Sequence, residues 1–280
     1  MPLDEKTTIA VTGANGLVGR ALLKRLQQTS AHVIALTRNA VELPANRTVT
    51  GPLNSPSALA ALGGATYVAH LAGILFPIGK DSYRSSNVEA TETVARALKN
   101  GKTRRVLFLS HVGASEGSKN IYLRTKAAAE RLLIETEKEV VVFRCTHIIG
   151  PPEAPGPFAL SLLKKQRKKA GVIGSGRQIV APIFVGDVVS ALVSAMKGGS
   201  PGIYELAGPE QMPMDDLVRL LNRNPAVPIS HLPNWAARMM SFLPILPFPF
   251  VDMILHDSVG NPAQATATFS LRLTSLRTVW

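Results

Sequence analysis

Three glycines spaced three residues apart constrain this chain more than any other feature of its sequence. The apolar run Ile9–Thr12 leads directly into Gly13, Gly16 and Gly19, and an amphipathic stretch follows. The first glycine lets the chain leave a strand tightly, the second lets the backbone approach a phosphate, and the third allows close packing of a helix. The order of strand, glycine turn and helix predicts a dinucleotide site with its pyrophosphate at the helix start. A plain strand-to-helix turn is the alternative.

Short apolar runs rich in β-branched residues alternate with amphipathic stretches through the first two-thirds of the chain, which predicts a parallel sheet covered by helices. The expected strands are Thr8–Thr12, His32–Thr37, Thr66–Leu71, Arg105–Ser110 and Val140–Arg144, with Arg47–Thr50 as a short additional strand. The expected helices are Leu17–Gln28, Ser82–Lys99, Ile121–Glu137, Phe158–Lys169, Val188–Met196 and Met214–Asn222. We therefore predict an α/β fold, a Rossmann-type doubly wound parallel sheet with a smaller C-terminal substrate lobe.

A proline-rich segment, Pro151–Pro157, divides the chain, because proline continues neither a sheet ladder nor a helix. We assign residues 1–150 to the dinucleotide-binding domain, which residues 177–200 would complete. Residues 151–176 and 201–280 would form the smaller lobe, for a substrate or a partner.

The smaller lobe contains one long uncharged segment, Met239–Val251. It is too short and too rich in proline to span a bilayer as a helix. It could line an apolar substrate pocket, dock on a membrane, bury against a partner, or form part of the lobe core.

The formal net charge of +12 leaves several partners open: nucleic acid, an anionic membrane surface, an anionic cofactor or an acidic partner subunit. Nucleic acid is the weakest of these, because the chain has no zinc-finger spacing, no ribonucleoprotein motif and only 5% aromatic residues. The basic cluster Lys164–Lys169 is either a docking patch or the solvated end of a helix.

The single cysteine, Cys145, excludes a disulfide framework and suits a reducing compartment. No apolar run precedes the first strand, so we expect no signal peptide. We expect a cytoplasmic protein, with peripheral attachment to a membrane as the alternative. The histidines show no metal-like spacing, so no metal site is expected, and His70 reads as a core histidine.

The end of the second expected strand indicates which dinucleotide is bound. An NAD site usually has a carboxylate about twenty residues after the glycine turn, where it holds the ribose hydroxyls. Here the strand ends in Leu36, Thr37 and Arg38. Arg38 offers a guanidinium fork for a 2′-phosphate, with Arg20 near enough to help. This favours NADP(H) over NAD(H); the alternative is that Arg38 covers the adenine face of NAD.

Tyr122 and Lys126 begin a strongly helical run, and residues four apart lie on one face of a helix. A cation beside the phenol would lower the pKa of Tyr122 towards a value useful for proton transfer. The lysine could also hold the nicotinamide ribose.

Together, the glycine turn, Leu71–Gly73, Asn87–Thr91 and the Tyr122–Lys126 pair resemble the short-chain dehydrogenase/reductase superfamily. Arg144, Ile148–Pro151 and Pro182–Val189 are similar to its extended branch, often described as the NAD-dependent epimerase/dehydratase family. More narrowly, Ser110–Ser115 followed by Tyr122–Ala127 resembles the NADPH-binding accessory subunit of respiratory complex I and its bacterial relatives. The resemblance covers roughly residues 7–220.

This resemblance implies a role for each matching position. Tyr122 would be the proton donor or acceptor, Lys126 its partner and ribose ligand, and Arg38 the ligand of the adenosine 2′-phosphate. The implied cofactor contacts are Gly13, Asn15, Gly16, Leu17, Gly19, Arg38, Leu71, Ala72, Gly73 and Lys126.

Two positions depart from the family pattern. Asn54 lies where an acidic residue usually follows the third strand. The serine or threonine that orients the substrate oxygen falls at His111 or Val112, so Ser110 or Ser115 would have to serve. Ser110 could instead cap the strand end.

These features support two hypotheses. The first is an NADP(H)-dependent reductase, dehydrogenase or epimerase acting on a small molecule. That substrate would be hydrophobic (isoprenoid, sterol-like or quinone) if the apolar Met239–Val251 lines the pocket, or a nucleotide-sugar as is common in the family. The second is a non-catalytic NADPH-binding accessory or redox-sensing subunit that docks on a membrane complex. We favour the enzyme, because Tyr122 and Lys126 are both present.

Overall fold

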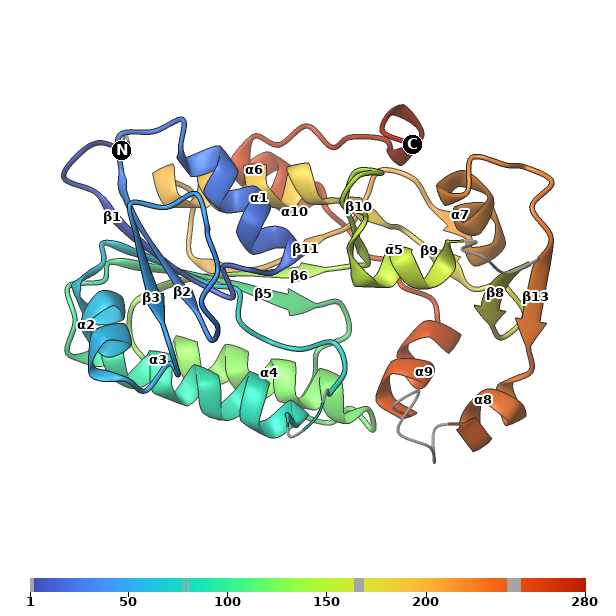
Figure 1. Ribbon diagram of the computed structural model, residues 1–280, viewed down its shortest axis with the longest axis horizontal. Helices are drawn as coiled ribbons and strands as arrows, with labels where there is room; N and C mark the ends of the chain where they lie inside the picture. The colour runs from blue at the N-terminus through green and yellow to red at the C-terminus, as the bar shows by residue number, and fades with distance from the viewer. Residues whose placement is uncertain (1–2, 78, 80, 164–168, 241–247) are drawn as a thin grey trace.

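The computed structural model describes residues 3–77, 79, 81–163, 169–240 and 248–280. One part is a twisted sheet between two layers of helices, and the other is a looser group of short elements (Figure 1). The sheet has seven parallel strands in the order β11-β6-β5-β4-β1-β2-β3. The strands are β1 (Thr8–Thr12), β2 (His32–Thr37), β3 (Arg47–Thr50), β4 (Tyr67–His70), β5 (Arg105–His111), β6 (Glu139–Cys145) and β11 (Gly202–Leu206).

The strand order reverses direction beside β1, which lies between β2 and β4. At such a switch point the connections leave to opposite sides, which opens a crevice at the carboxyl ends of the strands. Each strand expected in the first two-thirds of the chain forms, within two residues of its expected bounds. The doubly wound parallel sheet is therefore confirmed.

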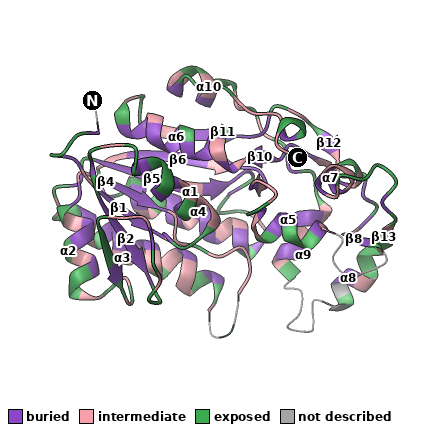
Figure 2. Ribbon diagram, turned by 45° about the horizontal axis from the view of Figure 1, so that its top comes forward, coloured by how far each residue is buried: buried purple, intermediate pink, exposed green. Residues whose placement is uncertain are grey.

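Each face of the sheet is covered by its own layer of helices (Figure 1). One layer contains α1 (Leu17–Leu26), α6 (Val185–Lys197) and α10 (Ala263–Phe269). The other contains α2 (Pro56–Gly64), α3 (Ala90–Lys99) with a π-helical turn at Arg84–Glu89 before it, and α4 (Ile121–Ile134). Alternate residues of β1 serve the two cores, with Ile9 and Val11 in one and Ala10 in the other. Burial on both faces explains why these strands are almost wholly apolar (Figure 2).

The smaller part of the molecule has a core of its own, built from short elements. Its paired strands are β7 (Ile148–Ile149) with β10 (Ile183–Phe184), β8 (Ala170–Ile173) with β13 (Ile229–Leu232), and β9 (Ile179–Val180) with β12 (Met212–Pro213). Its helices are α5 (Gly156–Leu162), α7 (Met214–Leu221), α8 (Asn234–Met240), α9 (Phe248–Leu255) and the 3₁₀ turn Leu276–Thr278. Tyr122 of α4 belongs to this core, so the two parts meet at that residue.

The boundary expected at residue 200 differs from the observed architecture. Residues 202–206 form β11, which pairs with β6 and extends the large sheet. Tyr204 and Leu206 are buried while Ile203 and Glu205 are exposed, the alternation of an edge strand covered on one face. Helix α10 returns to pack against this strand, with the Phe269 ring 4.9 Å from that of Tyr204. Parts of residues 201–280 therefore belong to the large sheet and to a helix layer that covers it.

The helix expected over Phe158–Lys169 is shorter than expected and ends at Leu162. Residues 164–168 of the basic cluster lie outside the described residues, as do residues 241–247 of the apolar segment. Among the described residues, no helix is both long and apolar enough to cross a membrane. Nor do those residues contain a group of histidine, cysteine or acidic side chains arranged to hold a metal ion.

Candidate functional site

One continuous groove runs across the carboxyl ends of the strands at the switch point. Its outer half, a cavity of about 590 Å³, lies over β2, the start of α3 and the residues after β3. Its inner half, about 310 Å³, lies between α4, the ends of β5 and β6, and α5. The two halves share Gly13, Gly16, Leu71, Gly73 and Ile74, which makes them one groove.

The three glycines meet three different requirements. Gly13 has a φ of +62°, and a Cβ there would lie 2.7 Å from the backbone of Leu71 and Ala72. A Cβ on Gly19 would lie 2.4 Å from the Gly13 carbonyl oxygen, so this glycine packs against the turn itself rather than against the sheet. A Cβ on Gly16 would meet only the Gly13 oxygen, at 3.3 Å, and Gly16 lines both halves of the groove.

The start of α1 suits an anion. No side chain caps its first amides, and no acidic residue lies in its first turn. Free amides and the helix dipole together attract a phosphate group. Backbone rather than side chain therefore faces the groove at Gly16, and a pyrophosphate fits there.

All the expected cofactor residues line this groove. Gly13, Asn15, Gly16, Arg38, Leu71, Ala72 and Gly73 line the outer half, and Leu17, Gly19 and Lys126 line the inner half. Asn54, at the departure after the third strand, also lines the outer half. Arg20, which we expected to assist Arg38, instead directs its Nε at Asn15 Oδ1, 2.9 Å away.

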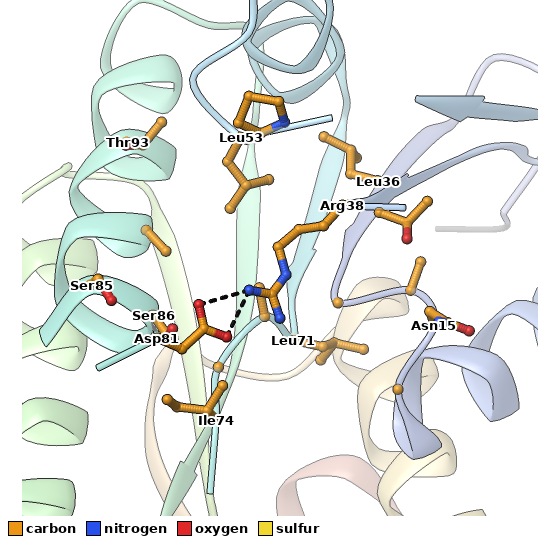
Figure 3. Close-up of a pocket in the computed structure, with 18 of the residues that line it drawn as sticks. Asn15, Leu36, Arg38, Leu53, Leu71, Ile74, Asp81, Ser85, Ser86 and Thr93 are labelled. Carbon is orange, nitrogen blue, oxygen red and sulfur yellow. Dashed lines mark hydrogen bonds and ion pairs between the residues drawn. The ribbon is translucent and has the colours of Figure 1, made fainter. Parts of the chain in front are cut away.

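Arg38 extends across the outer half towards Asp81 (Figure 3). Its Nη1 donates to both carboxylate oxygens of Asp81, at 2.9 and 2.8 Å. The Arg38 side chain is 69% exposed and that of Asp81 is 27% exposed. An exposed pair of this kind contributes little to stability and separates easily. A guanidinium is thus available at this end of the groove, with a carboxylate competing for it.

A buried hydrogen-bonded chain holds the floor of the groove. Thr12 Oγ1 accepts from the backbone N–H of Leu71 and of Ala72, so its own proton goes to His70 Nδ1, 2.7 Å away. His70 Nε2 then donates to Thr91 Oγ1 at 3.0 Å, and Thr91 donates to the Asn87 carbonyl oxygen. Burial lowers the pKa of His70 to about 3, which keeps it neutral. The expectation of a satisfied core histidine is confirmed.

The role of these hydrogen bonds in shaping the groove was not predicted from the sequence, although the sequence contained a signal for them. Thr12 and His70 are polar residues at the ends of two apolar strands, and they are direct partners in the register of β1 and β4. Polar residues at matched positions of neighbouring buried strands need each other as partners. The pair fixes where the chain turns away from both strands.

Tyr122 lies at the first turn of α4, in the inner half. Asn120 caps this helix by accepting the Tyr122 N–H at 3.0 Å, and its Nδ2 donates to the Pro249 carbonyl oxygen and to Asp252 of α9. The Tyr122 ring lies 5.8 Å from that of Tyr83. The capping role of Asn120 was not predicted from the sequence. The signal for it was a polar residue directly before the helical run.

The electrostatic setting of Tyr122 differs from the expectation. Burial, reinforced by Tyr83 and Cys145, raises its pKa above the usual range. Lys126 does not lower the pKa of Tyr122, because its Nζ donates to the Leu109 carbonyl oxygen at 2.5 Å and lies 4.2 Å from the Phe108 ring centroid. Burial lowers the pKa of Lys126 itself to about 8. The spacing of four does place both side chains on the inner half.

Ser110, His111 and His147 complete the inner half. Ser110 Oγ, His111 Nε2 and His147 Nε2 are buried and have no hydrogen-bond partner among the described residues. His111 meets Tyr122 edge to face, with centroids 5.7 Å apart, and His147 stacks on Phe158 at 4.0 Å. Three residues of one cavity wall thus each hold a polar atom without a partner, which is a feature that a polar ligand could satisfy.

Several curated proteins are similar to this chain. The chain is 29% identical over 227 residues to mitochondrial NADH dehydrogenase (ubiquinone) 1 alpha subcomplex subunit 9 of Arabidopsis thaliana, covering 75% of this chain and 56% of the relative. It is also 29% identical over 215 residues to ceramide reductase of Caulobacter vibrioides, covering 74% and 66%. The chain therefore spans between about half and two-thirds of the length of these relatives.

Solved structures support the fold. MoeE5, solved with UDP-glucuronic acid and NAD, superposes with a TM-score of 0.78 at 21% identity, over 97% of this chain and 96% of the other. UDP-glucuronic acid 4-epimerase of Bacillus cereus, solved with NAD, gives a TM-score of 0.75 at 19% identity, over 98% and 96%. At such identities the likeness concerns the fold.

The sequence profile of the NAD dependent epimerase/dehydratase family matches residues 9–207. This stretch contains the glycine turn, Arg38, Tyr122 and Lys126 and most of the large sheet. A nicotinamide dinucleotide is thus the cofactor that the groove supports. The chain belongs to the NAD dependent epimerase/dehydratase family.

Proposed function

We propose that this chain is an NADP(H)-dependent oxidoreductase or epimerase/dehydratase in which Tyr122 moves the proton. One observation carries the proposal: the buried Tyr122 and Lys126 line a cavity continuous with the glycine turn. Cofactor site and proton donor therefore share one groove. When bound, the dinucleotide supplies hydride transfer chemistry.

Each part of the groove has a task in this proposal. Amides at the start of α1 hold the pyrophosphate, and Arg38 releases Asp81 to hold the 2′-phosphate. The Lys126 ammonium donates to the nicotinamide ribose from the groove floor. Ser110, buried on the same cavity without a partner, is available to orient a substrate oxygen.

Tyr122 begins the reaction as an acid. Burial keeps its phenol protonated at neutral pH, because the raised pKa of Tyr122 disfavours the phenolate. A proton donor suits reduction of a carbonyl group, in which Tyr122 Oη would give its proton to the developing alkoxide. In the reverse direction the same oxygen would take the proton back.

The smaller lobe would close the substrate end of the groove and exclude water. Asn120 connects the helix of Tyr122 to α9, and Phe76 packs edge to face on Phe250 at 5.5 Å. We assign the substrate or partner lobe to residues 151–176 and to the part of residues 208–280 that covers this end.

A second candidate function is a non-catalytic NADPH-binding subunit that docks on a membrane complex. The relative named as a complex I subunit and the net charge of +12 favour it. His111, at the place expected for the orienting hydroxyl, also favours it. In either case we expect a cytoplasmic location, which would be peripheral to a membrane for the subunit.

Turnover separates the two candidates. The purified chain should oxidise NADPH in the presence of some member of a carbonyl and quinone panel. Tyr122→Phe should lower that rate by roughly 100-fold or more, the usual size of a lost acid catalyst, and leave NADPH affinity unchanged. Tyr204→Phe is the matched control, because its hydroxyl donates to the Ser200 carbonyl oxygen and Tyr204 does not line the groove. NADPH binding without turnover, or indifference to Tyr122→Phe, would favour the subunit.

A further inference from the structure

His111 ends β5 and faces the inner half of the groove beside Tyr122. It is 8% exposed, and its Nε2 has no hydrogen-bond partner among the described residues. The neighbouring His147 lies 6.1 Å away, ring to ring, and is itself packed on Phe158. The cavity therefore presents an imidazole edge at the position where the family pattern places a hydroxyl.

The backbone decides which nitrogen of His111 carries the proton. Nδ1 lies 2.6 Å from the Val112 carbonyl oxygen. A carbonyl oxygen can only accept a hydrogen bond, so Nδ1 must be the donor. Burial lowers the pKa of His111 to about 4, so the ring is neutral at pH 7 and carries a single proton. Nε2 is therefore left as a bare acceptor, buried without a partner in a residue that lines the cavity.

The remaining walls of the inner half are mainly apolar. Leu17, Ile74, Leu75, Ile148, Pro157 and Phe158 contribute to them. Lys126 is the one charged side chain in the described lining, and its ammonium is already bonded to the Leu109 carbonyl oxygen. Burying an anionic group here would be costly, because no further cation meets it.

We propose that His111 Nε2 accepts a hydrogen bond from a substrate hydroxyl, so that the inner half binds a neutral alcohol with an apolar body. This rests on the proposed function, since it places the substrate against Tyr122. A serine or threonine hydroxyl at this position could donate to a carbonyl or accept from an alcohol. His111 only accepts, so it recognises a hydroxyl group of the substrate and gives nothing to the carbonyl oxygen that Tyr122 would protonate.

The test compares two probes that differ in one hydrogen-bond donor. Protein labelled with ¹⁵N-histidine and saturated with NADPH is titrated with 2-octanol and with its methyl ether, 2-methoxyoctane. Neither probe is reduced by NADPH, so both report binding alone. We expect the alcohol to shift the Nε2 resonance of His111 and to bind roughly tenfold tighter than the ether, about 1.4 kcal/mol.

Two variants identify the acceptor. His111→Phe keeps a ring but removes the nitrogen, so the preference for alcohol over ether should disappear. His111→Gln supplies an amide oxygen and should restore most of it. NADPH affinity, measured on both variants, shows that each is folded.

The inference is overturned if wild-type protein binds alcohol and ether equally, binds neither, or keeps its preference in His111→Phe. A protonated Nε2 in the spectrum would also overturn it. Loss of NADPH binding by the wild-type protein would instead contradict the proposed function. The two failures are therefore distinguishable.

Discussion

The two halves of the groove offer a ligand different kinds of polar group, although both lie at the carboxyl edge of the same sheet. The outer half is charged, with a largely exposed Arg38 paired to a partly exposed Asp81 (Figure 3). The inner half is mostly neutral, with Tyr122, His111 and His147 all buried. Burial lowers the pKa values of the two histidines and raises that of the phenol, so none of the three is charged at pH 7.

The contrast predicts where substitutions matter most. An exposed ion pair contributes about 0–1 kcal/mol, since water screens it and competes for both partners. A buried polar group that loses its partner costs about 1–3 kcal/mol. A substitution in the outer half can therefore change the cofactor preference with little loss of stability. A substitution in the inner half is expected to cost more stability wherever it leaves a buried polar group without a partner.

The glycine turn belongs to both halves, so substitutions there should have the largest effect. Gly19→Ala puts a methyl group against the Gly13 and Ala14 carbonyl oxygens, at 2.4 and 2.7 Å, and backbone must move to admit it. We expect loss of dinucleotide binding and destabilisation by about 1–3 kcal/mol. Isothermal titration with NADPH and urea unfolding measure the two effects.

Gly16→Ala is the matched control for Gly19→Ala. Its methyl group would meet only the Gly13 oxygen, at 3.3 Å, and would otherwise project into the groove. We expect normal stability with weakened NADPH binding. If both variants bound NADPH like wild type, the pyrophosphate would lie elsewhere.

The buried histidines should also dominate the dependence of stability on acid pH. Burial lowers the pKa values of His70, His111 and His147 to about 3, 4 and 3, from 6.5 in the unfolded chain. As pH falls below 6.5 the unfolded chain takes up protons that the folded chain refuses, so stability falls by up to about 1.4 kcal/mol per pH unit for each histidine. The decline continues until the pH reaches the folded pKa values.

One variant isolates this effect. His147→Phe keeps the stacking on Phe158 and removes an Nε2 that has no partner among the described residues. Between pH 7.5 and pH 5 it should lose about 2 kcal/mol less stability than wild type. Urea unfolding at both values measures this, with a substitution of His32, exposed at the start of β2, as control. Equal losses in His147→Phe and wild type would mean that His147 takes up its proton at the same pH in the folded and the unfolded chain, so that burial does not lower its pKa.

Local signals in the sequence were sufficient for strands β1 to β6 of the sheet and for the glycine turn. Strand, turn and helix at residues 8–26 are specified by residues adjacent in the chain, through apolar runs and glycine spacing. The spacing of Tyr122 and Lys126 likewise placed both on one cavity. These features depend on backbone geometry alone, which short patterns determine.

Features that depend on distant partners could not be predicted. Asp81 meets Arg38 from 43 residues away, and Lys126 meets a carbonyl of the preceding strand rather than Tyr122. The strand β11 was missed because the short run Gly202–Leu206 suits a strand in a small lobe as well as one in the large sheet. Which neighbour covers such a strand is decided by tertiary packing, as is the proton position on His111.

The smallest predicted effect lies at the exposed end and tests the cofactor preference. Arg38→Ala should weaken NADPH binding about tenfold, as expected for one charge-assisted contact in solvent, and leave NADH unchanged. Asp81→Asn should strengthen NADPH binding, because it releases the Arg38 guanidinium from a competing carboxylate. Arg219→Ala, which removes an exposed ion pair with Asp216 of α7 away from the groove, is the control and should change neither affinity. Fluorescence titration with both nucleotides measures all three variants. Equal binding of NADPH and NADH by wild type, or a preference that survives Arg38→Ala, would mean that Arg38 covers the adenine ring and does not recognise a phosphate.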